Sequence, residues 1–297
     1  MMKLTKLAAI DVGSNAMRLL VNTIYDDGEQ ITFNKTSLVR APIRLGREAF
    51  TDQTISKDNQ KRMIKAMKAF RLLMDVHGVQ DYSAYATSAM REVKDSAKMI
   101  SKIKDKAGID LEIIDGHKEG NIIFETELKA YVKDENNYLY VDVGGGSTEC
   151  TLLANKKVIT TKSFKVGTVR WLEGKVGEDY LKKEVKPWIV ENCKGYDNIE
   201  LIGSGGNINH IYKQSDVKKG RPLSNRYLNK QRKIISALSF EDRLTIYNMK
   251  EDRADVIVPA LEIYCSILSY AKARKIHVPK IGLADGMIQY MYHHNKY

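Results

Sequence analysis

The chain contains the same strand–turn–strand pattern twice, about half its length apart. One copy reads Ala9-Ile10-Asp11-Val12-Gly13-Ser14-Asn15, and the other reads Tyr140-Val141-Asp142-Val143-Gly144-Gly145-Gly146. In both, an apolar run ends in Asp-Val-Gly, small residues follow, and a second apolar run begins. Short apolar runs are typical of buried strands, and a repeated supersecondary unit indicates repeated architecture. We therefore expect two similar lobes that face one cleft.

The glycines of the second copy favour an anion-binding loop. Gly144, Gly145 and Gly146 are consecutive, and residues without a Cβ allow several backbone N–H groups to converge on one anion. A lone triple glycine is more typical of a simple hairpin turn. The repetition of the whole context is what predicts a phosphate loop in each lobe.

Composition restricts the class of protein and its partners. The 297 residues carry a formal net charge of +11, which attracts polyanions such as phosphate-rich molecules. Three cysteines without CxxC spacing argue against a disulfide framework or a zinc site and favour the cytoplasm. The apolar patch Leu7–Ile10 is too short for a signal peptide, and no run is long enough to span a bilayer. We expect no membrane partner.

Strand and helix patterns alternate, which is typical of an α/β fold. Ser56 is a good helix N-cap, and apolar residues keep helical spacing from Ile64 to the stop at Gly78. The polar stretch 133–137 predicts a boundary between a first lobe, 1–132, and a second, 133–297, whose last helix can pack back on the first. Expected strands are 7–10, 17–25, 30–40, 82–86, 111–114, 138–143, 149–154, 157–165, 199–202 and 275–278. Expected helices are 56–77, 95–107, 117–132, 168–174, 178–193, 240–248, 255–273 and one at the end.

Four loops follow expected strands and are rich in glycine or hydroxyl residues: Asp11–Arg18, Thr87–Arg91, Asp142–Glu149 and Gly203–Asn207. Ligands of α/β folds usually gather at the carboxyl ends of strands. None of the loops has the Walker A pattern or the dinucleotide GxGxxG pattern. Together they predict a site that handles phosphate.

Phosphoryl transfer requires charge neutralisation, positioning and an activated nucleophile. Asp11, Asp142 and Glu149 are the candidate ligands of Mg²⁺, directly or through water. Arginine can hold phosphate oxygens bidentately, although Arg18 fits an ordinary strand-face residue equally well. The candidate substrate-binding residues of the four loops are Ser14, Asn15, Arg18, Thr87, Ser88, Arg91, Gly144, Gly145, Gly146, Ser147, Thr148, Gly205 and Gly206.

Glu119 and the basic stretch 213–233 each allow two interpretations. Glu119 stands at a helix start after a strand, where the residues alone favour a carboxylate that stabilises the helix dipole. The basic stretch holds eight basic residues against Asp216 and fits a solvated face or the path of an anionic substrate. On the second interpretation Lys218, Lys219 and Arg221 bind substrate. No nucleic-acid-binding motif appears, so we expect no nucleic-acid partner.

These motifs resemble the exopolyphosphatase and guanosine-pentaphosphate phosphohydrolase family, almost from end to end. The resemblance is carried by Ile10–Leu19, Ala86–Arg91, the segment before Glu119, Asp142–Glu149, Gly203–Gly206 and Arg253-Ala254-Asp255. It implies two ribonuclease-H-like lobes of the actin-like ATPase superfamily, with Mg²⁺ in the interlobe cleft. It also implies Glu119 as the catalytic base, Glu149 as a catalytic carboxylate that positions metal and water, and Arg253 as a substrate contact.

The chain departs from the family pattern at three places. Lys118 stands where an acidic residue often precedes the base, Gly206-Asn207 replaces the commoner Gly-Thr, and Leu283-Ala284-Asp285-Gly286 replaces Leu-Arg-Glu-Gly. No proposed ligand is lost, but substrate preference or rate can differ. Larger relatives carry further carboxy-terminal helical domains that are not found in this sequence, which puts processivity on long chains in question.

The expected activity is Mg²⁺-assisted hydrolysis of the terminal phosphate of inorganic polyphosphate, and of guanosine pentaphosphate as a second substrate, by water that Glu119 activates. One alternative is a regulatory protein that binds guanosine tetraphosphate or polyphosphate with little turnover. Another is an ATP-dependent kinase of the same superfamily. A homodimer is compatible with the sequence, which leaves the oligomeric state open.

Overall fold

The protein forms two compact units in the computed structural model, which describes residues 2–124, 128, 131–133, 136–279 and 282–295. Unit 1 comprises Met1–Glu127 together with Gly282–Tyr297, and unit 2 comprises Leu128–Ile281. Part of the expected helix 117–132 and part of the expected linker lie outside the described residues. No helix within the described ranges is both long and apolar enough to cross a bilayer.

Unit 1 is built on a five-stranded sheet with the strand order β3-β2-β1-β4-β5. The first three strands are antiparallel neighbours, and β4 and β5 run parallel to β1. Apolar side chains of β1 and β2, such as Leu7, Ile10 and Leu19, are fully buried. The strands are β1 (Lys3–Val12), β2 (Met17–Asp26), β3 (Ile31–Ala41), β4 (Asp81–Ala86) and β5 (Glu112–Ile113).

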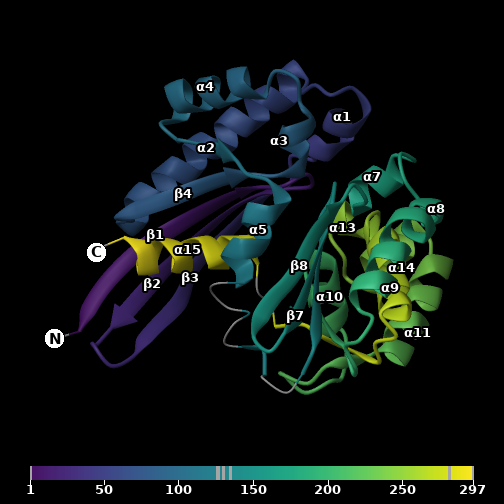
Figure 1. Ribbon diagram of the computed structural model, residues 1–297. Helices are drawn as coiled ribbons and strands as arrows, with labels where there is room; N and C mark the ends of the chain where they lie inside the picture. Colours follow the sequence, from purple (N-terminus) through teal and green to yellow (C-terminus); the bar gives the residue numbers. More distant parts are fainter. Residues whose placement is uncertain (1, 125–127, 129–130, 134–135, 280–281, 296–297) are drawn as a thin grey trace. The chain divides into compact units, whose positions relative to one another are not determined.

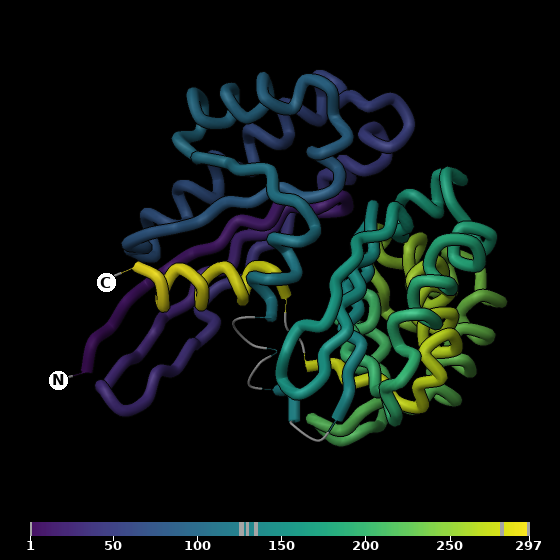
Figure 2. Tube along the Cα trace, in the orientation of Figure 1, coloured from purple at the N-terminus to yellow at the C-terminus, as the bar shows by residue number. Residues whose placement is uncertain are grey.

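Helices cover both faces of this sheet (Figure 1). Helices α2 and α4 pack against each other on one face, and α15 packs on β1, β2, β4 and α5 on the other. Figure 2 shows the carboxy-terminal helix, in yellow, alongside the purple amino-terminal strands. The helices of unit 1 are α1 (Leu45–Thr51), α2 (Lys57–His77), α3 (Ser88–Glu92), α4 (Ser96–Ala107), α5 (Gly116–Ile123) and α15 (Leu283–His294).

Unit 2 repeats the sheet order of unit 1 and adds one edge strand. Its order is β10-β11-β9-β6-β7-β8, in which β8, β7 and β6 form the antiparallel part and β9 and β11 run parallel to β6. This confirms the expected α/β fold with two ribonuclease-H-like lobes. The strands are β6 (Tyr138–Val143), β7 (Thr148–Ala154), β8 (Lys157–Phe164), β9 (Glu200–Ser204), β10 (Leu223–Ser224) and β11 (Lys275–His277).

The most apolar helix of unit 2, α14, packs against β6, α7, α9, α10 and α11. Nine of its side chains, among them Ile263 and Tyr264, are buried. The helices of unit 2 are α7 (Thr168–Leu172), α8 (Glu178–Tyr180), the π-helical η2 (Leu181–Val185), α9 (Lys186–Asn192), α10 (Gly206–Lys213), α11 (Asn225–Ala237), α12 (Phe240–Thr245), α13 (Glu251–Ala254) and α14 (Ile257–Tyr270).

Several local expectations are confirmed and others are wrong. The Ser56 hydroxyl caps α2, which ends at Gly78 in the left-handed conformation. The segment Thr87–Arg91 was expected to be a loop, but Thr87 occupies the N-cap position of α3 and the residues from Ser88 onward are helical. The helices α1, α10, α11 and α13 were not expected. In α10 the apolar spacing of Ile208, Ile211 and Tyr212 follows a glycine pair that favours a loop.

Candidate functional site

The turn between β1 and β2 places Asp11 opposite Arg18. The two residues are cross-strand partners in the antiparallel register, and Arg18 Nη1 lies 3.3 Å from Asp11 Oδ2. Burial raises the pKa of Asp11, and the Arg18 charge opposes that rise. The Gly13 N–H closes the turn by donating to the Ala16 carbonyl at 3.1 Å. The Asp11 carboxylate is thus already paired with a positively charged side chain, that of Arg18.

The start of α1 fixes the carbonyl groups of this turn. The Gly46 N–H donates to the Ser14 carbonyl at 2.8 Å, and the Arg44 N–H donates to the Asn15 carbonyl at 2.9 Å. Because the C=O and N–H of a trans peptide point in opposite directions, the N–H groups of Asn15 and Ala16 point away from α1. Backbone N–H groups that share one side of a turn are a typical arrangement for binding an anion.

Two serine hydroxyls of unit 1, those of Ser14 and Ser88, are within hydrogen-bond distance of each other. Ser14 Oγ and Ser88 Oγ lie 2.9 Å apart and are buried. The Thr87 N–H donates to the Val12 carbonyl at 3.2 Å, which holds the start of α3 against the end of β1. The structure therefore brings together Ser14 and Ser88, which the sequence places 74 residues apart.

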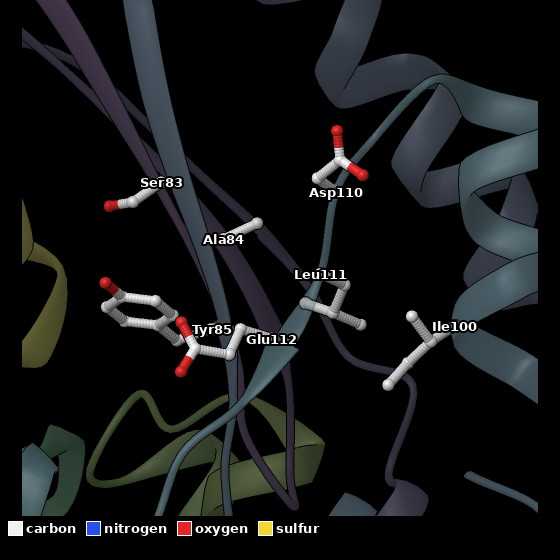
Figure 3. Close-up of a pocket in the computed structure, with 7 residues that line it drawn as sticks. All are labelled: Ser83, Ala84, Tyr85, Ile100, Asp110, Leu111 and Glu112. Atoms are coloured by element: carbon white, nitrogen blue, oxygen red, sulfur yellow. The ribbon is translucent and has the colours of Figure 1, made fainter. Parts of the chain in front are cut away.

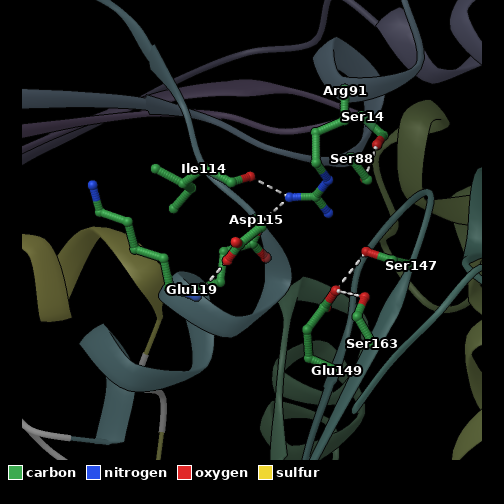
Figure 4. A network of polar contacts seen from close by, with 10 residues as sticks. Ser14, Ser88, Arg91, Ile114, Asp115, Glu119, Ser147, Glu149 and Ser163 are labelled. Carbon is green, nitrogen blue, oxygen red and sulfur yellow. Dashed lines mark hydrogen bonds and ion pairs between the residues drawn. The ribbon is translucent and has the colours of Figure 1, made fainter. Parts of the chain in front are cut away.

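Glu119 lies in the first turn of α5 and is held by Arg91 (Figure 4). Arg91 Nη1 donates to Glu119 Oε1 at 2.9 Å and also to the Ile114 carbonyl. Asp115 caps the helix by accepting the Lys118 N–H at 2.7 Å. Only 8% of the Glu119 surface is exposed. The helix amino terminus and the Arg91 guanidinium both favour the ionised form of this buried carboxylate.

Lys118 is directed to a different partner from its neighbour Glu119. Its Nζ lies 2.7 Å from Glu112 Oε1 and 4.8 Å from the centre of the Tyr85 ring. The pKa of Lys118 is raised; burial works against the rise, and the hydrogen bond to Glu112 favours it. The departure at Lys118 is therefore accommodated by an ion pair on the same unit.

The glycine loop of unit 2 is fixed in the same way as the turn of unit 1. The Thr168 N–H donates to the Gly144 carbonyl at 3.0 Å, and the N–H groups of Val169 and Arg170 donate to Gly145 at 2.8 and 3.0 Å. Arg170 Nε also donates to the Gly146 carbonyl at 2.9 Å. The three N–H groups of Gly145, Gly146 and Ser147 consequently point away from α7. This geometry is compatible with the expected phosphate loop, whose binding of phosphate stays a prediction.

Gly167 allows the residue before α7 to lie close to the backbone of the glycine loop. A Cβ at Gly167 would lie 2.5 Å from both the Gly145 carbonyl carbon and the Gly146 nitrogen. Gly46 has the corresponding place in unit 1, where a Cβ would lie 3.0 Å from Ser14 Cβ. Sequence reasoning missed Gly46, Gly167 and Arg170. The available signal was a glycine at or next to the start of a helix in each repeat.

Asp142 and Glu149 are cross-strand partners at the base of the glycine loop. Glu149 Oε1 accepts hydrogen bonds from Ser147 Oγ at 2.6 Å and from Ser163 Oγ at 2.8 Å (Figure 4). The Thr148 hydroxyl instead donates to the Val166 carbonyl at 2.6 Å. Ser163 lies on β8 and was not among the expected site residues, because only the strand register places it opposite Glu149.

Gly205 brings the end of β9 close to Asp142. Ser204 is the parallel-strand partner of Asp142, and Gly205 has a φ of 116°, which side-chain-bearing residues rarely adopt. A Cβ there would lie 3.1 Å from the Val143 carbonyl oxygen. The Tyr264 hydroxyl donates to the Ser204 carbonyl. Gly206 then begins α10.

The basic residues Lys218, Lys219 and Arg221 lie at the other end of α10. Tyr212, in the last turn of that helix, donates to the Lys218 carbonyl at 3.2 Å and accepts the Gly220 N–H at 3.0 Å. These contacts fix the backbone of the segment that carries the three basic side chains. Their contact with substrate stays a prediction.

Arg253 contributes to the electrostatics of α10. It lies in α13, and its charge adds to burial in lowering the pKa of His210, a residue of α10. The expected contact of Arg253 with substrate is likewise a prediction.

Asp142 and Glu149 fit a Mg²⁺ ion better than a metal that needs a complete protein cage. Among the described residues there is no group of three or more His, Cys, Asp or Glu side chains that could hold a metal. Magnesium is usually held by one or two carboxylates together with substrate phosphates and water. Two cross-strand carboxylates at the base of the glycine loop match the carboxylate part of that donor set. Asp11 fits less well because Arg18 already faces it.

A pocket in unit 1 lies away from these residues. It has a volume of about 330 Å³ and is lined by Ser83, Ala84, Tyr85, Ile100, Asp110, Leu111 and Glu112 (Figure 3). Its two carboxylates are already paired, Asp110 with Lys104 and Glu112 with Lys118. None of the expected site residues lines this pocket.

Comparison with known proteins identifies a matching phosphatase family and a similar solved structure. The Ppx/GppA phosphatase family model matches residues 24–295. The crystal structure of an exopolyphosphatase from Cytophaga hutchinsonii superimposes with a TM-score of 0.86 at 25% identity, and the match covers 98% of this chain and 99% of that one.

Two curated relatives are longer than this chain. A bifunctional 3-dehydroquinate synthase/phosphatase of Fusobacterium nucleatum is 32% identical over 67% of this chain. Exopolyphosphatase 1 of Mycobacterium bovis is 26% identical over 56% of this chain. The matches span 32% and 47% of those two relatives. With the family model matched over most of its length, the chain belongs to the Ppx/GppA phosphatase family.

Proposed function

We propose that the chain is an exopolyphosphatase that releases terminal orthophosphate from inorganic polyphosphate. The observation that carries this proposal is the placement of Glu119, a buried carboxylate in the first turn of α5 that Arg91 holds at 2.9 Å. Support comes from the family and from relatives described as exopolyphosphatases. In this proposal the turn of unit 1 and the glycine loop of unit 2 both bind phosphate.

Glu119 acts as the general base. Its carboxylate accepts a proton from water while the water oxygen bonds to the terminal phosphorus, and the bridging P–O bond breaks with its electron pair on the shortened chain. Positioned bases of this kind contribute about 10²–10⁴-fold to rate. Arg91 fixes the carboxylate from one side, which restricts its rotamers and keeps the proton-accepting oxygen in one place.

The loops bind the anionic end of the substrate. Backbone N–H groups after Gly144 and after Ser14 donate to phosphate oxygens, and Arg18 adds positive charge at the unit 1 turn. Such donors are preorganised, because their carbonyl groups are already bound by α7 and α1, so little reorganisation accompanies charge development.

Asp142 and Glu149 would hold Mg²⁺ when it is bound. The ion would neutralise charge on the phosphate oxygens and so make them more open to attack. Asp11 remains a further proposed ligand, through water, although its ion pair with Arg18 competes with a cation.

Guanosine pentaphosphate is a second proposed substrate, because it carries the same terminal phosphoanhydride. One assay separates these proposals from the alternatives: orthophosphate release from polyphosphates of several lengths, guanosine pentaphosphate and ATP, with Mg²⁺ and with chelator. Release from polyphosphate that the chelator abolishes supports the proposal. Tight binding without release indicates a regulatory protein, and ATP-dependent phosphorylation of a small acceptor indicates a kinase.

A further inference from the structure

The Ser163 hydroxyl lies against the carboxylate that the proposed function uses for metal and water. Strands β7 and β8 are antiparallel, and their register makes Ser163 the direct partner of Glu149. Ser163 Oγ donates to Glu149 Oε1 at 2.8 Å. Glu149 is only 4% exposed, so this contact is made in a largely water-excluded place, where hydrogen bonds to charged groups are strong.

Two hydroxyl donors converge on the same carboxylate oxygen. Ser147 Oγ also donates to Glu149 Oε1, at 2.6 Å. A carboxylate oxygen has about two lone-pair sites, and these two serines fill them. Oε1 is therefore the anchored oxygen of Glu149, and the orientation of the carboxylate plane is fixed from that side (Figure 4).

The two serines differ in what else they can do. Ser147 belongs to the glycine loop, and in the proposed function its hydroxyl is a phosphate donor. A serine hydroxyl has one proton to donate, so a phosphate that takes the Ser147 proton removes it from Glu149. Ser163 lies on β8, outside that loop, and can keep its hydrogen bond while phosphate is bound.

We propose that Ser163 is a positioning residue that holds the Glu149 carboxylate in its working orientation when substrate occupies the glycine loop. This inference rests on the proposed function. Without substrate Ser147 still anchors Oε1, so the inference predicts a loss in divalent cation binding at the lower end of the about 10–100-fold that removal of a partner of a metal ligand typically costs.

The same strand supplies a matched control. Thr161 lies two residues before Ser163 on β8, and its hydroxyl pairs with Thr151 on β7 at 3.1 Å. Thr161→Ala thus removes a cross-strand hydroxyl pair on the same strand pair without touching a carboxylate. Ser163→Thr keeps a hydroxyl at the tested position, and threonine is well tolerated in strands.

The test measures Mn²⁺ binding to the full chain without substrate, by electron paramagnetic resonance, together with kcat, KM and thermal unfolding. We expect Ser163→Ala to weaken Mn²⁺ binding or lower kcat by at least tenfold, with KM for polyphosphate within threefold. Ser163→Thr should recover most of that loss, and Thr161→Ala should match the wild type.

Two outcomes overturn the positioning role: wild-type Mn²⁺ affinity and kcat in folded Ser163→Ala, or an equal loss in Thr161→Ala. A double-mutant comparison gives a third such outcome. If Ser163→Ala lowers kcat by the same factor in the Glu149→Gln background as in the wild type, the two effects are additive and Ser163 does not act through Glu149. If the wild type releases no phosphate from any substrate, the proposed function fails, while the Mn²⁺ measurement still decides the role of Ser163.

Discussion

Arg91 donates a hydrogen bond to Glu119 at 2.9 Å and, through the same nitrogen, to the carbonyl of Ile114. The contact joins α3 to the start of α5 within unit 1. Burial removes water from the proposed base, and the hydrogen bond from Arg91 orients its carboxylate.

Arg91→Ala should lower phosphate release by at least tenfold and reduce the free energy of unfolding by about 1–3 kcal/mol, because the buried Glu119 carboxylate loses its charged donor. Steady-state kinetics and urea denaturation measure the two effects. Arg71→Ala is the control: its ion pair with Asp75 is about half exposed on both sides and should cost less than about 0.5 kcal/mol. Equal losses in the two variants would contradict a special role for Arg91.

Gly167→Ala should disturb the glycine loop. The added Cβ would lie 2.5 Å from loop backbone atoms, and overpacking of this kind costs about 1–3 kcal/mol. We expect a lower melting temperature and a raised KM for polyphosphate. Gly177→Ala is the matched control, because nothing lies within 4 Å of its added Cβ. A Gly167→Ala variant with wild-type melting temperature and KM would show that the close approach to α7 is dispensable.

Lys35→Met should destabilise the protein more at pH 7 than at pH 4. Burial raises the pKa of Asp285, and Lys35, whose Nζ lies 2.6 Å away, opposes that rise. A carboxyl with a raised pKa in the folded state loses stability as the pH rises from its unfolded value of 3.8 toward the folded value, and this loss deepens without Lys35.

Urea denaturation at both pH values tests this, with an expected extra loss of about 1 kcal/mol at pH 7 because Lys35 is half exposed. Lys104→Met, which breaks the exposed pair with Asp110, serves as the control and should show no comparable difference. In Asp285→Asn the added Lys35→Met change should cost the same at pH 4 and pH 7; a persisting pH dependence would assign it to another group.

Local sequence signals predicted much of the fold. The Ser56 cap and Gly78 stop defined α2, and the two repeated apolar runs defined β1–β2 and β6–β7. The helix α10 was missed because Gly205 and Gly206 favour a loop locally, whereas burial of Ile208 and Ile211 in unit 2 decides the outcome. Tertiary packing of apolar side chains outweighs a weak local preference of this size.

The contact between Glu149 and Ser147 joins two candidate residues of one sequence motif, which is why the sequence could single out both. Ser163 and Gly167 act through strand register and close backbone approach, which no local pattern of the sequence contains. For the basic residues Lys218 and Lys219, charge alone indicated a substrate path, and their contact with substrate stays a prediction.

The role of Glu119 is tested most directly by orthophosphate release from polyphosphate in Mg²⁺ by the wild type, Glu119→Gln and the control Glu112→Gln. Glu112 is exposed and pairs with Lys118, so its change should leave release intact. We expect Glu119→Gln to retain polyphosphate binding, measured separately, and to lose at least 100-fold in kcat, as removal of a general base does. Wild-type turnover by Glu119→Gln would contradict the account.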